Sequence, residues 1–214
     1  MPNSKRLFIL STVLIFSFSL LASPARSQDR WGDPMPKLLT QREQMEVREG
    51  WLRKRLGTLL PGMMKRHGID MWIVVNEEFN SDPVTPHITP PIPIVGRRDI
   101  FLFIDRGNSL ERIAMVRYDE ERLKNHYRMV MPARDKFGEE LKKIVDERKP
   151  KTIALNIGGS RGQQSGLSYD SYRFLAESLG AENEKKFVSA ADLLVEYFDT
   201  RLPEELEHYR NAVA

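Results

Sequence analysis

Three short apolar runs between residues 69 and 116 constrain the fold most strongly. Residues 69–75 (Ile-Asp-Met-Trp-Ile-Val-Val) are rich in β-branched side chains and are long enough for one buried strand. Residues 100–104 and 112–116 flank the turn-forming segment 105–109 (Asp-Arg-Gly-Asn-Ser). This spacing predicts an antiparallel hairpin that lies beside the first strand.

A helix is predicted before the first strand. Residues 40–43 (Thr-Gln-Arg-Glu) have the pattern of a capping box. Apolar residues then recur at helical spacing, at Met45, Leu52, Leu56, Leu59 and Met63. Pro61 is expected either to kink this helix or to begin a second one, and Gly68 is expected to end it.

The second half of the chain alternates between helices and strands. A helix carrying Leu141, Ile144 and Val145 should end before Pro150. The remaining predicted elements are a short strand at 127–131, a strand at 152–157, a helix from Ser168 to Gly180, a short strand at 186–188, and a helix capped by Ser189 that runs through Phe198. A hairpin beside βαβ units predicts an α/β fold with a mixed sheet flanked by helices.

The amino-terminal segment is predicted to be a signal peptide, residues 1–27. Lys5 and Arg6 precede an apolar run at 7–22, and the small residues Ala25 and Ser27 suit cleavage between Ser27 and Gln28. An uncleaved anchor is the alternative, although the run is short for a membrane span. Residues 28–39 then form a polar tail. Export to the periplasm or medium is expected, without a disulfide, because the chain has no cysteine.

Cleavage changes the charge of the chain. The full sequence has 33 Lys+Arg and 30 Asp+Glu, and residues 1–27 hold three of the bases and no acid. The mature chain is therefore 30 against 30, with no net charge. This balance argues against a nucleic-acid partner, and no membrane span is expected after cleavage.

Residues 200–214 predict a helix that begins with Pro203 and an acidic first turn. Leu206, Tyr209 and Val213 form an apolar stripe on it that has no predicted partner downstream. We therefore expect this helix to be the start of a linker into a further, catalytic domain, so that the chain is a fragment of a longer protein.

The long loop after the first strand, residues 76–99, contains five prolines and several polar side chains. Long ordered loops at strand ends often carry function. Its candidate substrate-rim residues are Asn80, Asp82, His87, Arg97 and Arg98. The alternative is a proline-rich surface connection with solvated charges.

Residues 158–162 (Gly-Gly-Ser-Arg-Gly) match the nucleophile elbow of α/β-hydrolases. Ser160, with Asp192 or Asp199 and then His208, would supply the residue types of a serine hydrolase. An elbow needs a helix at once, however, and Gly166 opposes one here. The alternative is a flexible connection between a strand and a helix.

No metal site is predicted in this chain. Its histidines lie far apart, and none belongs to a metal-binding motif. His67 is interpreted as a helix C-terminal residue, and His126 and His208 as members of charged helix faces.

Three segments resemble the amino-terminal domain of the creatinase/prolidase/aminopeptidase P family of metallopeptidases. They are residues 64–75 (Met-Lys-Arg-His-Gly-Ile-Asp-Met-Trp-Ile-Val-Val), 166–172 (Gly-Leu-Ser-Tyr-Asp-Ser-Tyr) and 189–212, which includes Asp-Thr-Arg-Leu-Pro-Glu-Glu-Leu. The resemblance implies a ribonuclease H-like fold for residues 40–199, homo-oligomer contacts, and a wall over the active site of a neighbouring catalytic domain.

The resemblance also implies that a divalent metal pair is held by two Asp, one His and two Glu in that second domain, and none of these ligands maps onto this chain. Many peptidase members carry Asn-x-x-Tyr-Leu-x-Gly after the first strand, where this sequence has residues 80–84 (Asn-Ser-Asp-Pro-Val) and prolines. The expected function is that of a non-catalytic domain of an exported Xaa-Pro aminopeptidase- or prolidase-like enzyme. A free-standing exported binding module is the alternative from another class.

Overall fold

The computed structural model describes residues 38–91 and 96–213. The predicted signal peptide (1–27), its cleavage site at Ser27 and Gln28, and most of the predicted tail (28–39) lie outside the described residues. So does part of the proline-rich loop. The unit described below begins at Leu39. Within the described ranges, every helix is too short or too polar to cross a lipid bilayer.

Six strands form one mixed sheet in the described part of the chain. They are β1 (Met71–Glu77), β2 (Arg98–Asp105), β3 (Leu110–Met115), β4 (Arg128–Val130), β5 (Ile153–Leu155) and β6 (Phe187–Ser189). Their order across the sheet is β4-β3-β2-β1-β5-β6. β2 runs antiparallel to β1 and β3, whereas the β3–β4, β1–β5 and β5–β6 pairs are parallel. The predicted hairpin and the mixed α/β sheet are therefore confirmed.

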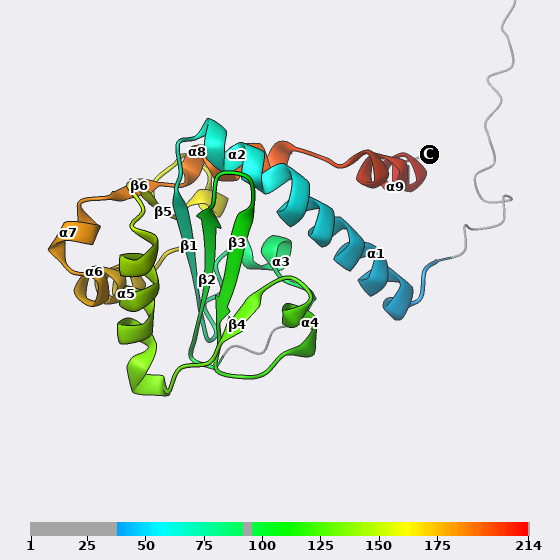
Figure 1. Cartoon of the computed structure of the whole chain (residues 1–214). Helices are drawn as coiled ribbons and strands as arrows, with labels where there is room; N and C mark the ends of the chain where they lie inside the picture. Colours follow the sequence, from blue (N-terminus) through cyan, green and yellow to red (C-terminus); the bar gives the residue numbers. More distant parts are fainter. Residues whose placement is uncertain (1–37, 92–95, 214) are drawn as a thin grey trace, which may run out of the picture. The chain divides into compact units, whose positions relative to one another are not determined.

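Helices precede, connect and follow these strands in the described part of the chain. The longer ones are α1 (Gln41–Lys54), α2 (Leu60–Arg66), α5 (Phe137–Arg148), α6 (Tyr169–Leu179), α8 (Ala191–Asp199) and α9 (Pro203–Val213). The short ones are α3 (Thr85–Ile88), α4 (Glu121–Lys124), α7 (Ala181–Glu184) and the 3₁₀ turns Arg134–Lys136 and Gly162–Gln164. α5 and α6 lie side by side, and α9 is the last helix before the chain end (Figure 1).

The first helix begins as predicted. The Thr40 hydroxyl accepts a hydrogen bond from the Glu43 backbone N–H at 3.3 Å, and the Glu43 carboxylate accepts one from the Thr40 N–H at 2.7 Å. After α1 the chain passes through a π-helical turn, Arg55–Leu59, and Pro61 lies in the first turn of α2. Pro61 therefore begins a second helix, which is one of the two predicted outcomes, because a proline has no N–H to donate to the preceding turn. Gly68 then ends the helix with φ +64°.

The sheet has an apolar core on each face. Alternate residues of β1 point to opposite sides, as strand geometry requires. Met71, Ile73 and Val75 pack with side chains of α5 and α6. Trp72 and Val74 pack with side chains of α1, α2 and α8.

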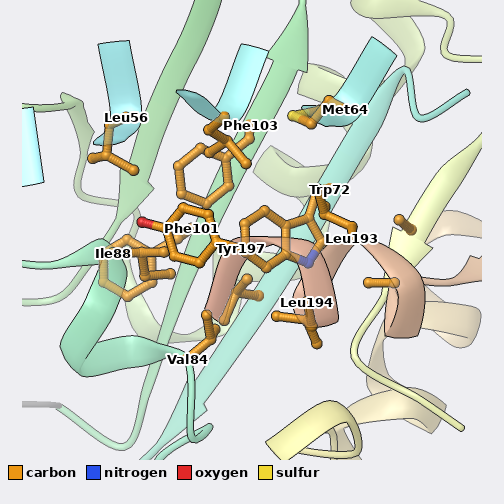
Figure 2. Close-up of a cluster of buried hydrophobic side chains, with 14 of the residues drawn as sticks. Leu56, Met64, Trp72, Val84, Ile88, Phe101, Phe103, Leu193, Leu194 and Tyr197 are labelled. Carbon is orange, nitrogen blue, oxygen red and sulfur yellow. The ribbon is translucent and has the colours of Figure 1, made fainter. Parts of the chain in front are cut away.

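An aromatic group forms the centre of the second core (Figure 2). Trp72 stacks on Phe103 with ring centroids 4.9 Å apart, and Tyr197 of α8 meets Trp72 edge-on at 6.4 Å. All three side chains are fully buried. This group holds α8, and therefore the start of α9, against the sheet.

Two local predictions need correction. The N-cap position of α8 is Ala190, whereas Ser189 was expected; the Ser189 hydroxyl still accepts a hydrogen bond from the Ala191 N–H at 3.1 Å. His126 lies buried in the turn after α4 and is not on a charged helix face. Its neighbours Leu123 and Tyr127 are core residues, and they carry the turn inward. His67 is the C-cap of α2, as predicted.

Candidate functional site

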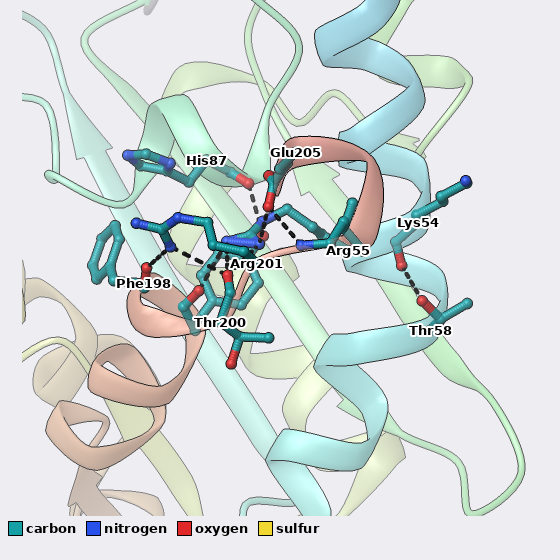
Figure 3. Close-up of polar contacts among 10 residues, drawn as sticks. Lys54, Arg55, Thr58, His87, Phe198, Thr200, Arg201 and Glu205 are labelled. Atoms are coloured by element: carbon teal, nitrogen blue, oxygen red, sulfur yellow. Dashed lines mark hydrogen bonds and ion pairs between the residues drawn. The ribbon is translucent and has the colours of Figure 1, made fainter. Parts of the chain in front are cut away.

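A cavity of about 400 Å³ lies between α1, α3 and the junction of α8 with α9. Figure 3 shows the polar contacts of His87, Arg55, Arg201 and Glu205, which contribute to its wall. Three arginines, one histidine and three aromatic side chains contribute to its wall. The lining residues used here are Arg48, Trp51, Arg55, Pro86, His87, Gln163, Phe198, Asp199, Arg201, Glu205 and Tyr209. They come from segments that are far apart in the sequence.

Two buried tyrosines position the α3 segment beside the cavity. The Tyr197 hydroxyl donates a hydrogen bond to the His87 carbonyl oxygen at 2.8 Å, and the Tyr127 hydroxyl donates one to the Ile88 carbonyl oxygen. These two bonds satisfy consecutive backbone acceptors at the end of the short helix. The His87 ring then meets the Phe198 ring edge-on, with centroids 5.0 Å apart.

Arg55 links the π-helical turn to the end of α8 and the start of α9. Its Nη2 donates to the Tyr197 carbonyl oxygen at 2.9 Å, and its Nη1 donates to the Thr200 carbonyl oxygen at 2.9 Å. Nη1 also lies 3.4 Å from Oε2 of Glu205. The same Glu205 oxygen accepts a hydrogen bond from the Leu202 N–H at 2.7 Å and so caps α9. One buried ion pair therefore fixes where α8 ends and where α9 begins.

Two further arginines lie at the exposed side of the cavity. Arg201 donates through Nη1 to the carbonyl oxygens of Phe198 and Thr200, and its guanidinium lies 5.7 Å from the centre of the Tyr209 ring. Arg48 is exposed on α1 and forms no ion pair with a described residue. The cavity acid Asp199 is paired with Arg161 at 3.2 Å. The cavity therefore carries an excess of positive charge.

The charge of His87 depends on its burial and on the charged residues around the cavity. Partial burial of its ring lowers the pKa of His87 below its ordinary value, and the nearby Arg55, Arg48 and Arg201 lower it further. Glu205 acts in the opposite direction. The imidazole is therefore held in its neutral form close to neutral pH.

The predicted rim residue Asp82 lies in a buried polar network. Asn156 donates to its carboxylate at 2.8 Å, and Trp72 donates to the Asn156 side-chain oxygen at 2.7 Å. The Val84 N–H donates to the other Asp82 oxygen at 2.9 Å. Burial raises the pKa of Asp82. The network joins the loop after β1 to the end of β5.

The other predicted rim residues lie elsewhere. Asn80 is exposed and forms a β-bridge with Glu77. Arg97 and Arg98 line a second cavity of about 230 Å³, where Arg98 stacks 3.9 Å from the centre of the Phe174 ring. The structure therefore places His87, the Asp82 network and the two arginines in separate surroundings. The substrate-rim role of these residues stays a prediction.

Ser160 is exposed in an irregular segment, and within the described residues the nearest following helix is a short 3₁₀ turn. Its proposed partners have other contacts. Asp199 pairs with Arg161, and the His208 ring lies 5.1 Å from the Trp51 ring. The arrangement lacks the strand-turn-helix geometry of a nucleophile elbow.

The donor set of the cavity does not fit a divalent metal pair, because three guanidinium groups would repel the cations and cannot coordinate them. Within residues 38–91 and 96–213, no three histidine or carboxylate side chains are grouped as a metal site would require.

Sequence reasoning found His87 but missed the three cavity arginines. Arg48 and Arg55 are seven residues apart on one helix face, on the same stripe as buried Leu52. Charged residues in an apolar stripe are a usable signal for a cavity. Arg201 gives no such signal, because it follows the last turn of α8.

No protein-family model matches the sequence, and no curated protein sequence matches it. Solved structures are similar in fold. The X-Pro aminopeptidase from Thermotoga maritima MSB8 matches with a TM-score of 0.50 and 21% identity, over 69% of this chain and 37% of that chain. The Xaa-Pro dipeptidase from Bacillus anthracis matches with a TM-score of 0.46 and 18% identity, over 76% and 38% of the two chains.

A third structure, the aminopeptidase P, Xaa-Pro aminopeptidase, from Streptococcus thermophilus, matches with a TM-score of 0.46 and 13% identity, over 72% of this chain and 98% of that chain. The likeness to the Thermotoga protein shows that this chain shares the fold of the matched part of that X-Pro aminopeptidase, as the resemblance implied. The chain spans little more than a third of the length of that protein.

Proposed function

We propose that this chain is the amino-terminal, non-catalytic domain of an exported Xaa-Pro aminopeptidase-like hydrolase. The observation that supports it most is the shared fold with the Thermotoga X-Pro aminopeptidase, which involves only 37% of that protein. The rest of that protein lies outside the match. We infer that the catalytic residues of the parent hydrolase lie in a following domain.

The attachment of α9 supports this role. Arg55 pairs with Glu205 in the interior, Lys54 pairs with Glu204 at the surface, and the rings of Trp51 and His208 pack edge-on. Three contacts over the first two turns set the direction of α9 relative to α1. A helix held in this way would give a following domain a fixed orientation.

In such a protein, a divalent metal pair in the catalytic domain would activate a water for attack on an amide carbonyl. The residues of this chain would contribute shape, since they would exclude water and limit the length of the substrate. Contacts between copies of this domain would support a homo-oligomer. The predicted signal peptide would direct the protein to the periplasm or the medium.

The positively charged cavity favours a second candidate, a free-standing exported binding module. Reading the coding sequence beyond the codon for Ala214 separates the two candidates. A continued frame with two Asp, one His and two Glu at metal-ligand positions would support the proposal. A stop codon at that point would contradict it and support the binding module.

A further inference from the structure

We propose that the cavity between α1 and α9 binds a small organic carboxylate, with Arg48 and Arg201 holding the carboxylate against the aromatic wall formed by Trp51, Phe198 and Tyr209. This site is independent of the proposed peptidase function. It needs only the 214-residue chain, so its test succeeds or fails separately from that function.

The charge of the cavity is the first argument. Arg55 is compensated by Glu205, and the acid Asp199 is compensated by Arg161. Arg48 and Arg201 lie on the same cavity and form no ion pair with a described residue. Like charges in one partly desolvated space repel one another, so a bound anion would lower the free energy of the site.

The second argument is the hydrogen-bonding capacity of Arg201. Its Nη1 donates hydrogen bonds to the carbonyl oxygens of Phe198 and Thr200, and these bonds hold the guanidinium near His87 (Figure 3). Its Nε and Nη2 form no hydrogen bond with a described residue. A guanidinium that is already held in position binds a planar carboxylate with a small loss of side-chain entropy.

The third argument is the apolar part of the wall. Trp51, Phe198 and Tyr209 line the cavity together with Pro86, and Tyr209 is 54% exposed although it is a large apolar side chain. The cavity volume of about 400 Å³ lies in the range of small-molecule sites. Inorganic phosphate would leave this surface uncovered, whereas a carboxylate with an aromatic or aliphatic body would cover it.

His87 provides a reporter inside the site. It faces Arg48 from α1, Arg55 from the π-helical turn, Arg201 from the α8–α9 junction, and Glu205 from α9. A bound carboxylate would offset the arginine charges that now lower the pKa of His87. Binding should therefore raise that pKa, which NMR of the imidazole can follow.

The test measures binding of phenylacetate to the 214-residue chain by calorimetry, and the pKa of His87 by NMR. We expect saturable binding with a millimolar or lower Kd and an upward shift of the His87 pKa. Arg48→Gln should weaken binding by about 10-fold or more, because a charge-assisted hydrogen bond is lost. Arg42→Gln removes the same charge from the exposed first turn of α1, outside the cavity, and should leave the Kd unchanged.

Arg48 has no described partner, so its replacement should leave the fold intact, and an unchanged melting temperature checks this. Arg201→Gln is the second variant and should weaken binding in the same way. Phenylacetamide, the neutral analogue, and inorganic phosphate, which has no apolar part, should both bind at least 10-fold more weakly. Equal binding of either probe, equal loss in Arg42→Gln and Arg48→Gln, or no binding of phenylacetate at about 10 mM would overturn the proposal.

Discussion

Nη1 of Arg55 and Oε2 of Glu205 lie 3.4 Å apart in the interior, with their side chains only 8% and 11% exposed. Arg55 precedes β1 and Glu205 follows β6, so this pair joins the two ends of the described unit. The guanidinium also donates hydrogen bonds to the carbonyl oxygens of Tyr197 and Thr200. The pair therefore connects the folding of the sheet core to the position of α9.

Replacing Arg55 should destabilise the protein strongly. Arg55→Ala leaves the Glu205 carboxylate buried without its charge partner, which typically costs about 3–5 kcal/mol of unfolding free energy. Lys54→Ala is the matched control, because it breaks the neighbouring but exposed pair with Glu204 and should change stability little. Urea unfolding of both variants checks this, and a similar loss in the two would contradict the importance of the buried pair.

Gly166→Ala should also destabilise the protein. A Cβ at Gly166 would clash with the carboxylate of Asp82, which is held by Asn156 and by the Val84 N–H. The forced movement should cost about 1–3 kcal/mol. Gly50→Ala is the control, since Gly50 lies inside α1 with open space around it, and alanine there should stabilise the helix by about 0.5–1 kcal/mol. Thermal melts that move in the same direction for both variants would refute this reading of the Asp82 network.

Asp99 should make stability fall as the pH rises. Burial raises the pKa of Asp99 from 3.8 to about 7, against the opposing effect of the Arg117 backbone N–H, and the charge of Glu120 adds to the increase. Between these two pH values the folded state binds more protons than the unfolded state, so the free energy of unfolding decreases with rising pH. At about 1.36 kcal/mol per pKa unit, the loss approaches roughly 4 kcal/mol above pH 7.

Asp99→Asn should abolish that loss. The stability difference between the variant and the parent should increase from pH 4 to pH 8 and then level off. The opposing effect of His87 and His126, whose pKa values are lowered, is common to both proteins and cancels in the difference. A difference for Asp99→Asn that does not change with pH would show that the folded protein does not retain the proton.

Phe79 should be a site where glycine stabilises the protein. Its side chain is 99% exposed and its backbone has φ +62°, in the left-handed region that costs an ordinary residue about 1–2 kcal/mol. Phe79→Gly removes this strain and Phe79→Ala keeps it. We expect the glycine variant to be about 1 kcal/mol more stable than the alanine variant in urea unfolding. The reverse order would mean that the turn is not strained in solution.

The alternation and spacing of apolar residues predicted the fold of this chain well, because they reflect which side chains face a core. The alternation in 71–75 places Trp72 on one core and Ile73 on the other, and β-branched runs with a turn between them define the hairpin. The burial of His126 was not predictable, because the residues around it in the sequence are mostly charged. Leu123 and Tyr127, which pack in the core and carry the turn inward, are too few to form a periodic apolar pattern. Apolar cores produce periodic patterns in the sequence, whereas single buried polar residues do not.

The cavity could be predicted only in part. His87 was predicted as a site residue because it lies in the long loop after the first strand. Arg55 and Arg201, however, reach the cavity from opposite ends of the described unit. Their meeting depends on how α8 packs on Trp72 and on where α9 begins. No periodic pattern encodes a contact between residues that are more than 140 positions apart.

The most direct test of the central claim is a peptidase assay of the purified 214-residue chain on an Xaa-Pro peptide with added Mn²⁺ or Co²⁺. Since the catalytic residues are proposed to lie in a following domain, release of the amino-terminal residue should not exceed that in a protein-free blank. Metal-dependent release that remains proportional to the concentration of the purified chain would contradict the account.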